Sequence, residues 1–231
     1  MLAEAIGYLK SSDDVWKTSV IGGLLLAFGF LLIPLFVVWG YVVRVVDRTA
    51  HDDEEAPVFE DWGEMTVEGA KAFAILLVYA LVPLVVGSVI VGGVWAATGG
   101  APGAVGGAIM ALGGLLTVAL LIAAAYVGPA AIAHFAEERR FGDGFDFETL
   151  RPVLSSGTYA TRWLLSLAVI VVAAAVSGAL NAIPIVGIFL GAVVSFYALV
   201  TAYYIIGHAW ADARPVSLED RGDFPREKPA V

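Results

Sequence analysis

Five long stretches of this chain contain almost no charged residue, and this feature limits its fold more than any other. Asp, Glu, Lys and Arg occur in these segments only at the ends. A helix that crosses a bilayer needs about 20 apolar residues, and each segment provides them. We therefore expect an all-α fold, a polytopic transmembrane helical bundle. The segments cover residues 20–46, 70–97, 104–135, 163–182 and 185–210.

Two of the connections between these segments are short and uncharged. Residues 98–103 join the second and third segments, and residues 181–184 join the fourth and fifth. Short links between long apolar segments are typical of antiparallel helical hairpins. The other connections are longer and charged. We interpret residues 1–212 as a single integral membrane domain and residues 213–231 as a polar, disordered cytoplasmic tail.

The basic residues predict an orientation, because Lys and Arg in short loops stay on the cytoplasmic side. Eleven of the 13 basic residues share one side if segments two to five all cross. This distribution predicts a multi-pass protein of the cell membrane with its C-terminus in the cytoplasm. The eleven are Arg44, Arg48, Lys71, Arg139, Arg140, Arg151, Arg162, Arg214, Arg221, Arg226 and Lys228.

The first segment, residues 20–46, allows two interpretations. If it spans the membrane, Lys10 and Lys17 lie outside, whereas all basic residues lie inside if it enters and returns. Pro34 at its middle permits such a re-entrant hairpin, provided that the turn is buried against protein. A span of 27 residues is the alternative. The sequence leaves both open.

The residues before this segment predict a short interfacial helix. Leu2, Ile6 and Leu9 recur at helical spacing, and Glu4 points elsewhere. Polar residues 11–14 should end the helix.

Composition excludes several classes of function. The chain has no cysteine, so thiolate chemistry and cysteine-based metal sites are excluded. Its net charge is -9, which argues against a nucleic-acid partner. An acidic excess with only four lysines is typical of proteins from salt-loving organisms, because net charge maintains solubility where screening is strong. We expect a halophilic source.

Several motifs together resemble a family of prokaryotic membrane proteins called domain of unknown function 4013. The resemblance extends from about residue 11 to residue 212. In this family the loop before the tryptophan reads more like Leu-Pro-x-Trp, whereas Pro57 comes earlier here. The resemblance implies a multi-pass, largely archaeal membrane protein and brings no activity or site with it. The motifs are Gly40-Tyr41-Val42-Val43-Arg44, Phe59-Glu60-Asp61-Trp62, Glu68-Gly69-Ala70-Lys71, Gly128-Pro129 and Phe145-Asp146-Phe147.

One group of side chains has the composition of a metal site. His134 precedes Glu137 and Glu138 by three and four residues, and His208 precedes Asp212 by four, so each histidine shares a helical face with a carboxylate. If the two helix ends met, they could offer nitrogen and oxygen ligands to a divalent ion. Solvated interfacial side chains are the simpler interpretation. We therefore assign no catalytic, cofactor or metal residue and predict no cofactor.

The apolar segments contain no embedded charge, which makes a proton- or sodium-coupled transporter less favoured. Our first hypothesis is a non-enzymatic protein for permeation or transport of a small or lipid-like solute, or a subunit of a membrane complex. A membrane enzyme or lipid-handling protein that uses His134 and His208 is the second, and a structural or assembly role is the third. Expected partners are anionic lipid headgroups, contacted by Arg44, Arg48, Arg139 and Arg140, and a second copy or another membrane subunit, contacted through small residues. A pore would be lined by Ser88, Thr117, Ser166, Ser177, Asn181 or Ser195.

Overall fold

The computed structural model describes residues 2–11, 15–53 and 55–214, and in these residues every regular element is helical. This confirms the predicted all-α class. Residues 12–14 and most of the predicted tail lie outside the described residues. The helices are α1 (Leu2–Gly7), η1 (Tyr8–Ser11), α2 (Val15–Ala27), η2 (Gly29–Leu31), α3 (Ile33–Ala50), α4 (Trp62–Ala97), α5 (Gly103–Glu138), η3 (Phe141–Phe145), α6 (Phe147–Leu154), α7 (Gly157–Leu180) and α8 (Val186–Ala213).

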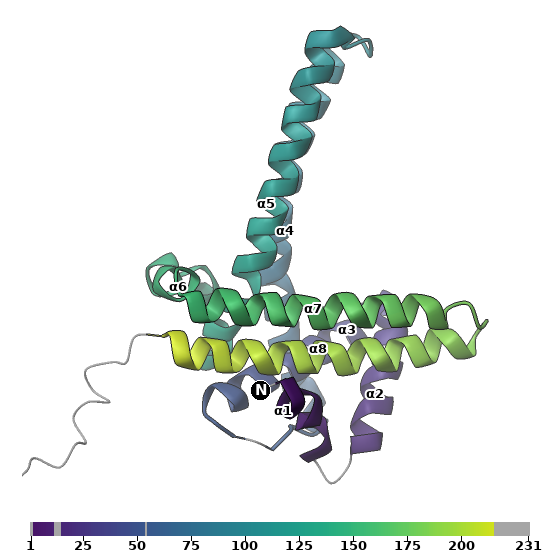
Figure 1. Cartoon of the computed structure of the whole chain (residues 1–231), viewed down its shortest axis with the longest axis vertical. Helices are drawn as coiled ribbons and strands as arrows, with labels where there is room; N and C mark the ends of the chain where they lie inside the picture. The colour runs from purple at the N-terminus through teal and green to yellow at the C-terminus, as the bar shows by residue number, and fades with distance from the viewer. Residues whose placement is uncertain (1, 12–14, 54, 215–231) are drawn as a thin grey trace, which may run out of the picture.

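In the described part of the chain, four helices are long and apolar enough to cross a membrane, namely α4, α5, α7 and α8. They form the two predicted hairpins, α4–α5 and α7–α8, which extend in different directions from a common region (Figure 1). Helix α4 begins at Trp62, eight residues before the predicted segment, because two polar turns continue the apolar helix into the common region. The chain is therefore a multi-pass membrane protein.

The first apolar segment is broken into two helices. Leu32 takes a left-handed conformation with φ of 65° after η2, and Pro34 then lies in the first turn of α3. Helix α2 runs toward the hairpin tip, since a Cβ on Gly22 would meet Phe196 whereas Phe28 lies beside Phe189. Helix α3 returns, from Tyr41 beside Phe196 to Thr49 beside Gly207. Helices α2 and α3 therefore run in opposite directions along α8, on either side of the break at Leu32.

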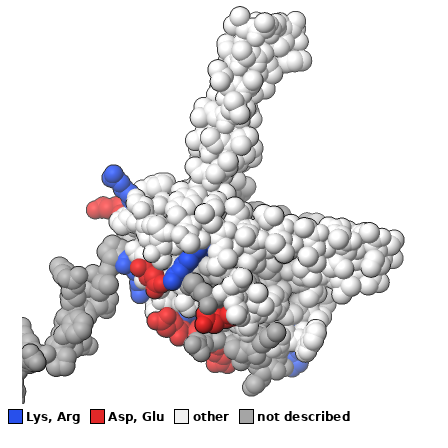
Figure 2. Space-filling view, viewed as in Figure 1, with Lys and Arg blue, Asp and Glu red and all other residues white. Residues whose placement is uncertain are grey.

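Most buried side chains lie in one region, which we call the base. It comprises α3, the first turns of α4, the last turns of α5, η3, α6, the start of α7 and the second half of α8. Trp210, Tyr41 and Phe135 are fully buried there. The charged side chains gather around the base, and both hairpins project from it as uncharged surfaces (Figure 2).

The outer part of the α4–α5 hairpin, residues 80–120, is called the arm here. Its two helices pack closely on each other, because a Cβ at Gly113 would collide with Ile90 and one at Gly87 with Thr117. The arm buries little besides this seam, and Val89 and Leu115 are exposed by 68% and 67%. Such a surface is stable where lipid replaces water.

The predicted N-terminal helix is present, and of the apolar residues Leu2, Ile6 and Leu9 only Leu9 is buried. Ala5, Tyr8 and Leu9 are buried, whereas Leu2 and Ile6 are nearly half exposed. The reason is that α1 packs on α8, where Tyr8 meets Tyr204 with ring centroids 4.6 Å apart.

Candidate functional site

An ion-pair network joins three helices at the base. Arg139, the residue that ends α5, places Nη2 2.6 Å from Asp47 of α3 and binds Glu68 of α4 through Nη1. Arg44 lies 3.8 Å from the second oxygen of Glu68 and 3.6 Å from Glu64. Every carboxylate in this network has a cationic partner, so its chemical role is to clamp helices together.

Two of the arginines that were expected to meet lipid headgroups also have partners within the chain. Arg44 and Arg139 are engaged by carboxylates, and the contact with headgroups stays a prediction. Arg140 pairs with Asp143 at 3.0 Å and keeps 74% of its side chain exposed, so it still has a surface for headgroups.

Among the described residues, the predicted metal ligands do not form one group, and other side chains contact each of them. His134 stacks on Trp210 with ring centroids 5.3 Å apart, and Trp210 Nε1 donates to Glu137 at 2.8 Å. His208 instead packs against Tyr204, on another face of α8. Within the described residues no group of three or more potential ligands could hold a metal ion. The carboxylates of this set are paired, Glu137 with Arg214, Glu138 with Arg140 and Asp212 with Arg162.

The six polar residues that were predicted to line a pore are divided between the two hairpins. Ser88 and Thr117 lie on the arm, whereas the others lie in α7 and α8 or the turn between them. Ser166 donates to Ala202 O at 3.0 Å, and Ser177 lies 3.1 Å from Ser195. These hydroxyls join α7 to α8, so the structure does not bring the six residues together as a lining.

The aromatic residues spaced by seven along α8 belong mainly to the core. Phe196, Tyr203 and Trp210 are buried, whereas Phe189 is 39% exposed near the hairpin tip. This stripe therefore forms no ligand groove.

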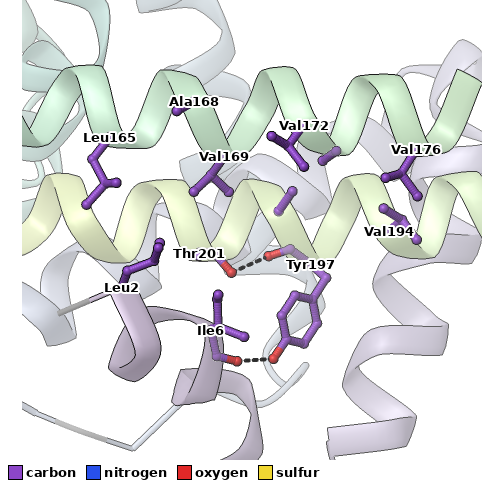
Figure 3. A pocket seen from close by; sticks show the side chains of 12 residues that line it. Leu2, Ile6, Leu165, Ala168, Val169, Val172, Val176, Val194, Tyr197 and Thr201 are labelled. Atoms are coloured by element: carbon purple, nitrogen blue, oxygen red, sulfur yellow. Dashed lines mark hydrogen bonds between the residues drawn. The ribbon is translucent and has the colours of Figure 1, made fainter.

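A groove does lie on another face of the same hairpin, between α1, α7 and α8 (Figure 3). It has a volume of about 460 Å³ and an almost wholly apolar lining. Tyr197 closes one side, because its hydroxyl donates to the carbonyl of Ile6 and holds α1 against α8. The other lining residues are Leu2, Ile6, Leu165, Ala168, Val169, Val172, Ala173, Val176, Val194, Ala198 and Thr201. We call this the α7–α8 groove.

A second, more polar pocket adjoins the groove toward the base. Leu165 lines both, and the second pocket is completed by the first turns of α7, with Gly157, Thr158, Thr161 and Arg162. Arg162 Nη1 donates to His208 O at 2.6 Å, and Nη2 pairs with Asp212. The second pocket therefore adds an arginine and two threonines beside the apolar groove.

The groove was not predicted from the sequence, although the apolar pattern of one of its walls is visible there. Leu165, Val169, Val172 and Val176 recur at intervals of four, three and four along α7, which places them on one face. The wall that α1 supplies had no such signal, because it depends on a contact between residues 191 positions apart.

A model of the family described as "Protein of unknown function (DUF4013)" matches residues 24–182. No curated protein and no solved structure matches the chain. The matched range contains the motifs that carried the resemblance, and these meet at the base. A Cβ on Gly40 would collide with the Met65 carbonyl, one on Gly69 with the Phe36 carbonyl, and Arg44 lies beside Glu68.

Proposed function

This chain belongs to the DUF4013 family of proteins of unknown function, and we propose that it is a non-enzymatic membrane protein that binds a lipid-like solute. The observation that carries this proposal is the α7–α8 groove, which is apolar, concave and built on two helices long enough to span the membrane. Its volume lies within the range of small-molecule sites, about 300–1,000 Å³.

The length of the groove supports a lipid chain as its occupant. Its lining on α7 runs from Leu165 to Val176, which corresponds to roughly 17 Å at the rise of an α-helix. One leaflet of a bilayer contributes about half of a hydrocarbon core some 30 Å thick. An acyl or isoprenoid chain of one leaflet therefore matches the groove in polarity and in length.

We place the base, and with it the polar end of the groove, on the cytoplasmic side of the cell membrane. The support is that every described arginine lies at the base or in the connections beside it, and arginine in short loops favours the cytoplasm. A halophilic archaeal source remains a prediction from the acidic composition.

The test fills the groove with a larger side chain. Ala168 lines it, so Ala168→Phe should displace a bound chain, whereas Ala174 is exposed on α7 outside the lining and Ala174→Phe is the matched control. Both variants and the unaltered chain are purified in mild detergent, and co-purifying lipid is measured by native mass spectrometry. We expect retained lipid to fall several-fold in Ala168→Phe alone. If the two variants retained equal amounts of lipid, the proposal that the groove binds the lipid would be wrong.

A second candidate is self-assembly through the arm, in the class of membrane-complex subunits. A shallow hollow of about 340 Å³ lies on one side of the arm, and it includes Ser88, Gly114 and Thr117. A Cβ at Gly114 would meet no atom within 4 Å, so nothing in the described chain explains a glycine there. Small residues let membrane helices approach closely, and we propose a second copy as the partner because most oligomers are homo-oligomers.

The oligomer proposal is tested by light scattering in detergent. Gly114→Leu should block the hollow and convert a dimer to a monomer, while Ala111→Leu, on the same helix outside the hollow, should not. A monomeric unaltered protein would contradict this candidate without touching the groove proposal.

A further inference from the structure

The polar pocket beside the α7–α8 groove has the position of a headgroup site. Leu165 belongs to both pockets, and Arg162, Thr161 and Thr158 follow it toward the start of α7. Arg162 lies three residues, or roughly 4.5 Å of helix rise, closer to the base than Leu165. A molecule that occupies both pockets would have its apolar chain toward the hairpin tip and its polar end toward the base.

We infer that the solute of the groove is a phospholipid whose phosphate binds at Arg162 and the neighbouring Thr158 hydroxyl. This inference rests on the proposed function and names the chemical class of the solute. A guanidinium is a planar fork of donors that matches phosphate oxygens better than other side chains do. Thr158 adds a hydroxyl group on the same pocket wall, whereas the Thr161 hydroxyl donates to the Gly157 carbonyl at 2.8 Å.

The guanidinium of Arg162 is held in place before any ligand arrives. Its Nη1 donates to the His208 carbonyl at 2.6 Å, its Nη2 pairs with Asp212, and its side chain is only 18% exposed. No hydrogen bond among the described residues uses its Nε. A cation that is fixed and partly desolvated attracts phosphate more strongly than a mobile one on the surface.

The negative charge of Asp212 disfavours a phosphate at Arg162, so a change at Asp212 tests the site independently of a change at Arg162. Its carboxylate is 55% exposed and shares the guanidinium of Arg162, so it repels an incoming anion. Replacing it by Asn keeps a hydrogen-bond acceptor of the same shape and removes the charge. Phosphate binding should therefore strengthen in Asp212→Asn and weaken in Arg162→Gln.

The experiment compares two lipids that differ in the phosphate headgroup. The full chain in detergent is incubated with phosphatidylglycerol or with diacylglycerol of the same acyl chains, and retained lipid is counted by native mass spectrometry. We expect about tenfold more phosphatidylglycerol than diacylglycerol, as one charge-assisted hydrogen bond would produce. Arg162→Gln should abolish the preference, Asp212→Asn should raise it, and the control Arg151→Gln, an exposed arginine outside both pockets, should preserve it.

The outcomes separate this inference from the proposed function. Retention of both lipids to the same extent would overturn the phosphate site and leave the groove intact. Retention of neither lipid would overturn the proposed function as well. If inorganic phosphate at millimolar concentration bound at Arg162 with no effect on either lipid, the pocket would be a phosphate site unconnected to the groove, and the inference would be wrong. An unchanged preference in Asp212→Asn would also contradict it, and that variant keeps Arg162.

Discussion

The two helices of the arm, α4 and α5, continue into the base, yet they are packed differently in the two regions. In the base, Ile75 of α4 and Phe135 of α5 are fully buried, whereas Val89 and Leu115 of the arm are more than two-thirds exposed. Their side chains are equally apolar, so hydropathy does not distinguish the two regions. Apolar side chains therefore have two different surroundings in this protein: other side chains in the base, and membrane lipid along the arm.

The largest difference between the base and the arm is expected when a glycine in each region is replaced by alanine. Gly40→Ala in α3 would push a methyl group into the Met65 carbonyl, and because the obstacle is backbone, α3 and α4 must separate. We expect a loss of about 3 kcal/mol of stability. Gly92→Ala on the arm meets no atom within 4 Å and should stabilise the helix by up to about 1 kcal/mol. Thermal unfolding in detergent measures both.

Equal losses for the two alanine variants would mean that the arm packs as tightly as the base. The outcome would favour a second copy covering Gly92, and light scattering on the same samples would then detect the dimer.

The next largest effect concerns the clamp at the base. Arg139→Gln should cost about 1–3 kcal/mol, because Glu68 and Asp47 lose a cationic partner where Glu68 is only 14% exposed. The neighbouring Arg140→Gln should change stability by less than about 0.5 kcal/mol, since that side chain is mostly solvated. Arg139 also has φ of 59°, a conformation that glycine adopts easily at the end of a helix. Arg139→Gly therefore keeps the end of α5 and removes only the side chain with its ion pairs.

The outcome for Arg139→Gly decides what the arginine contributes. A loss similar to that in Arg139→Gln would assign the effect to the ion pairs. A stability equal to that of the unaltered chain would show that the clamp is unimportant and that hydrophobic packing alone holds the base.

The sequence predicted the spanning helices well, because their apolar length is a local property. Residues 70–97 and 163–182 lie within α4 and within α7 and its following turn, and Pro34 marked the broken first segment as one of two alternatives. Contacts between distant residues were not predictable. Arg139 meets partners 71 and 92 residues away, and hydropathy does not determine the register of one helix against another. The groove was missed for the same reason, since α1 folds back onto α8.

A smaller effect is expected where α1 joins α8. Tyr197→Phe removes the hydroxyl that donates to the Ile6 carbonyl and should cost about 1 kcal/mol. The loss should be local, so amide hydrogens of residues 2–9 should exchange faster while those of α6 stay protected. Faster exchange throughout the base would show instead that α1 is part of the cooperative core and that the groove wall does not move independently.

The smallest effect concerns the surface of the base, at the start of α6. Asp146 accepts hydrogen bonds from the Thr149 hydroxyl at 2.7 Å and from the amides of Glu148 and Thr149. The Thr149 hydroxyl is the main cause that lowers the pKa of Asp146 below its usual 3.8. Because the pKa of Asp146 is lower in the folded than in the unfolded chain, its carboxylate stabilises the start of α6 fully at any pH above the unfolded-state pKa. This stabilisation is lost as the pH falls through the folded-state pKa. Amide protection of residues 147–154, corrected for intrinsic exchange, should therefore be lower at pH 3 than at pH 7. In Asp146→Asn, which caps without titrating, the protection should be the same at both values, and a pH dependence that survives this substitution would have to come from another group.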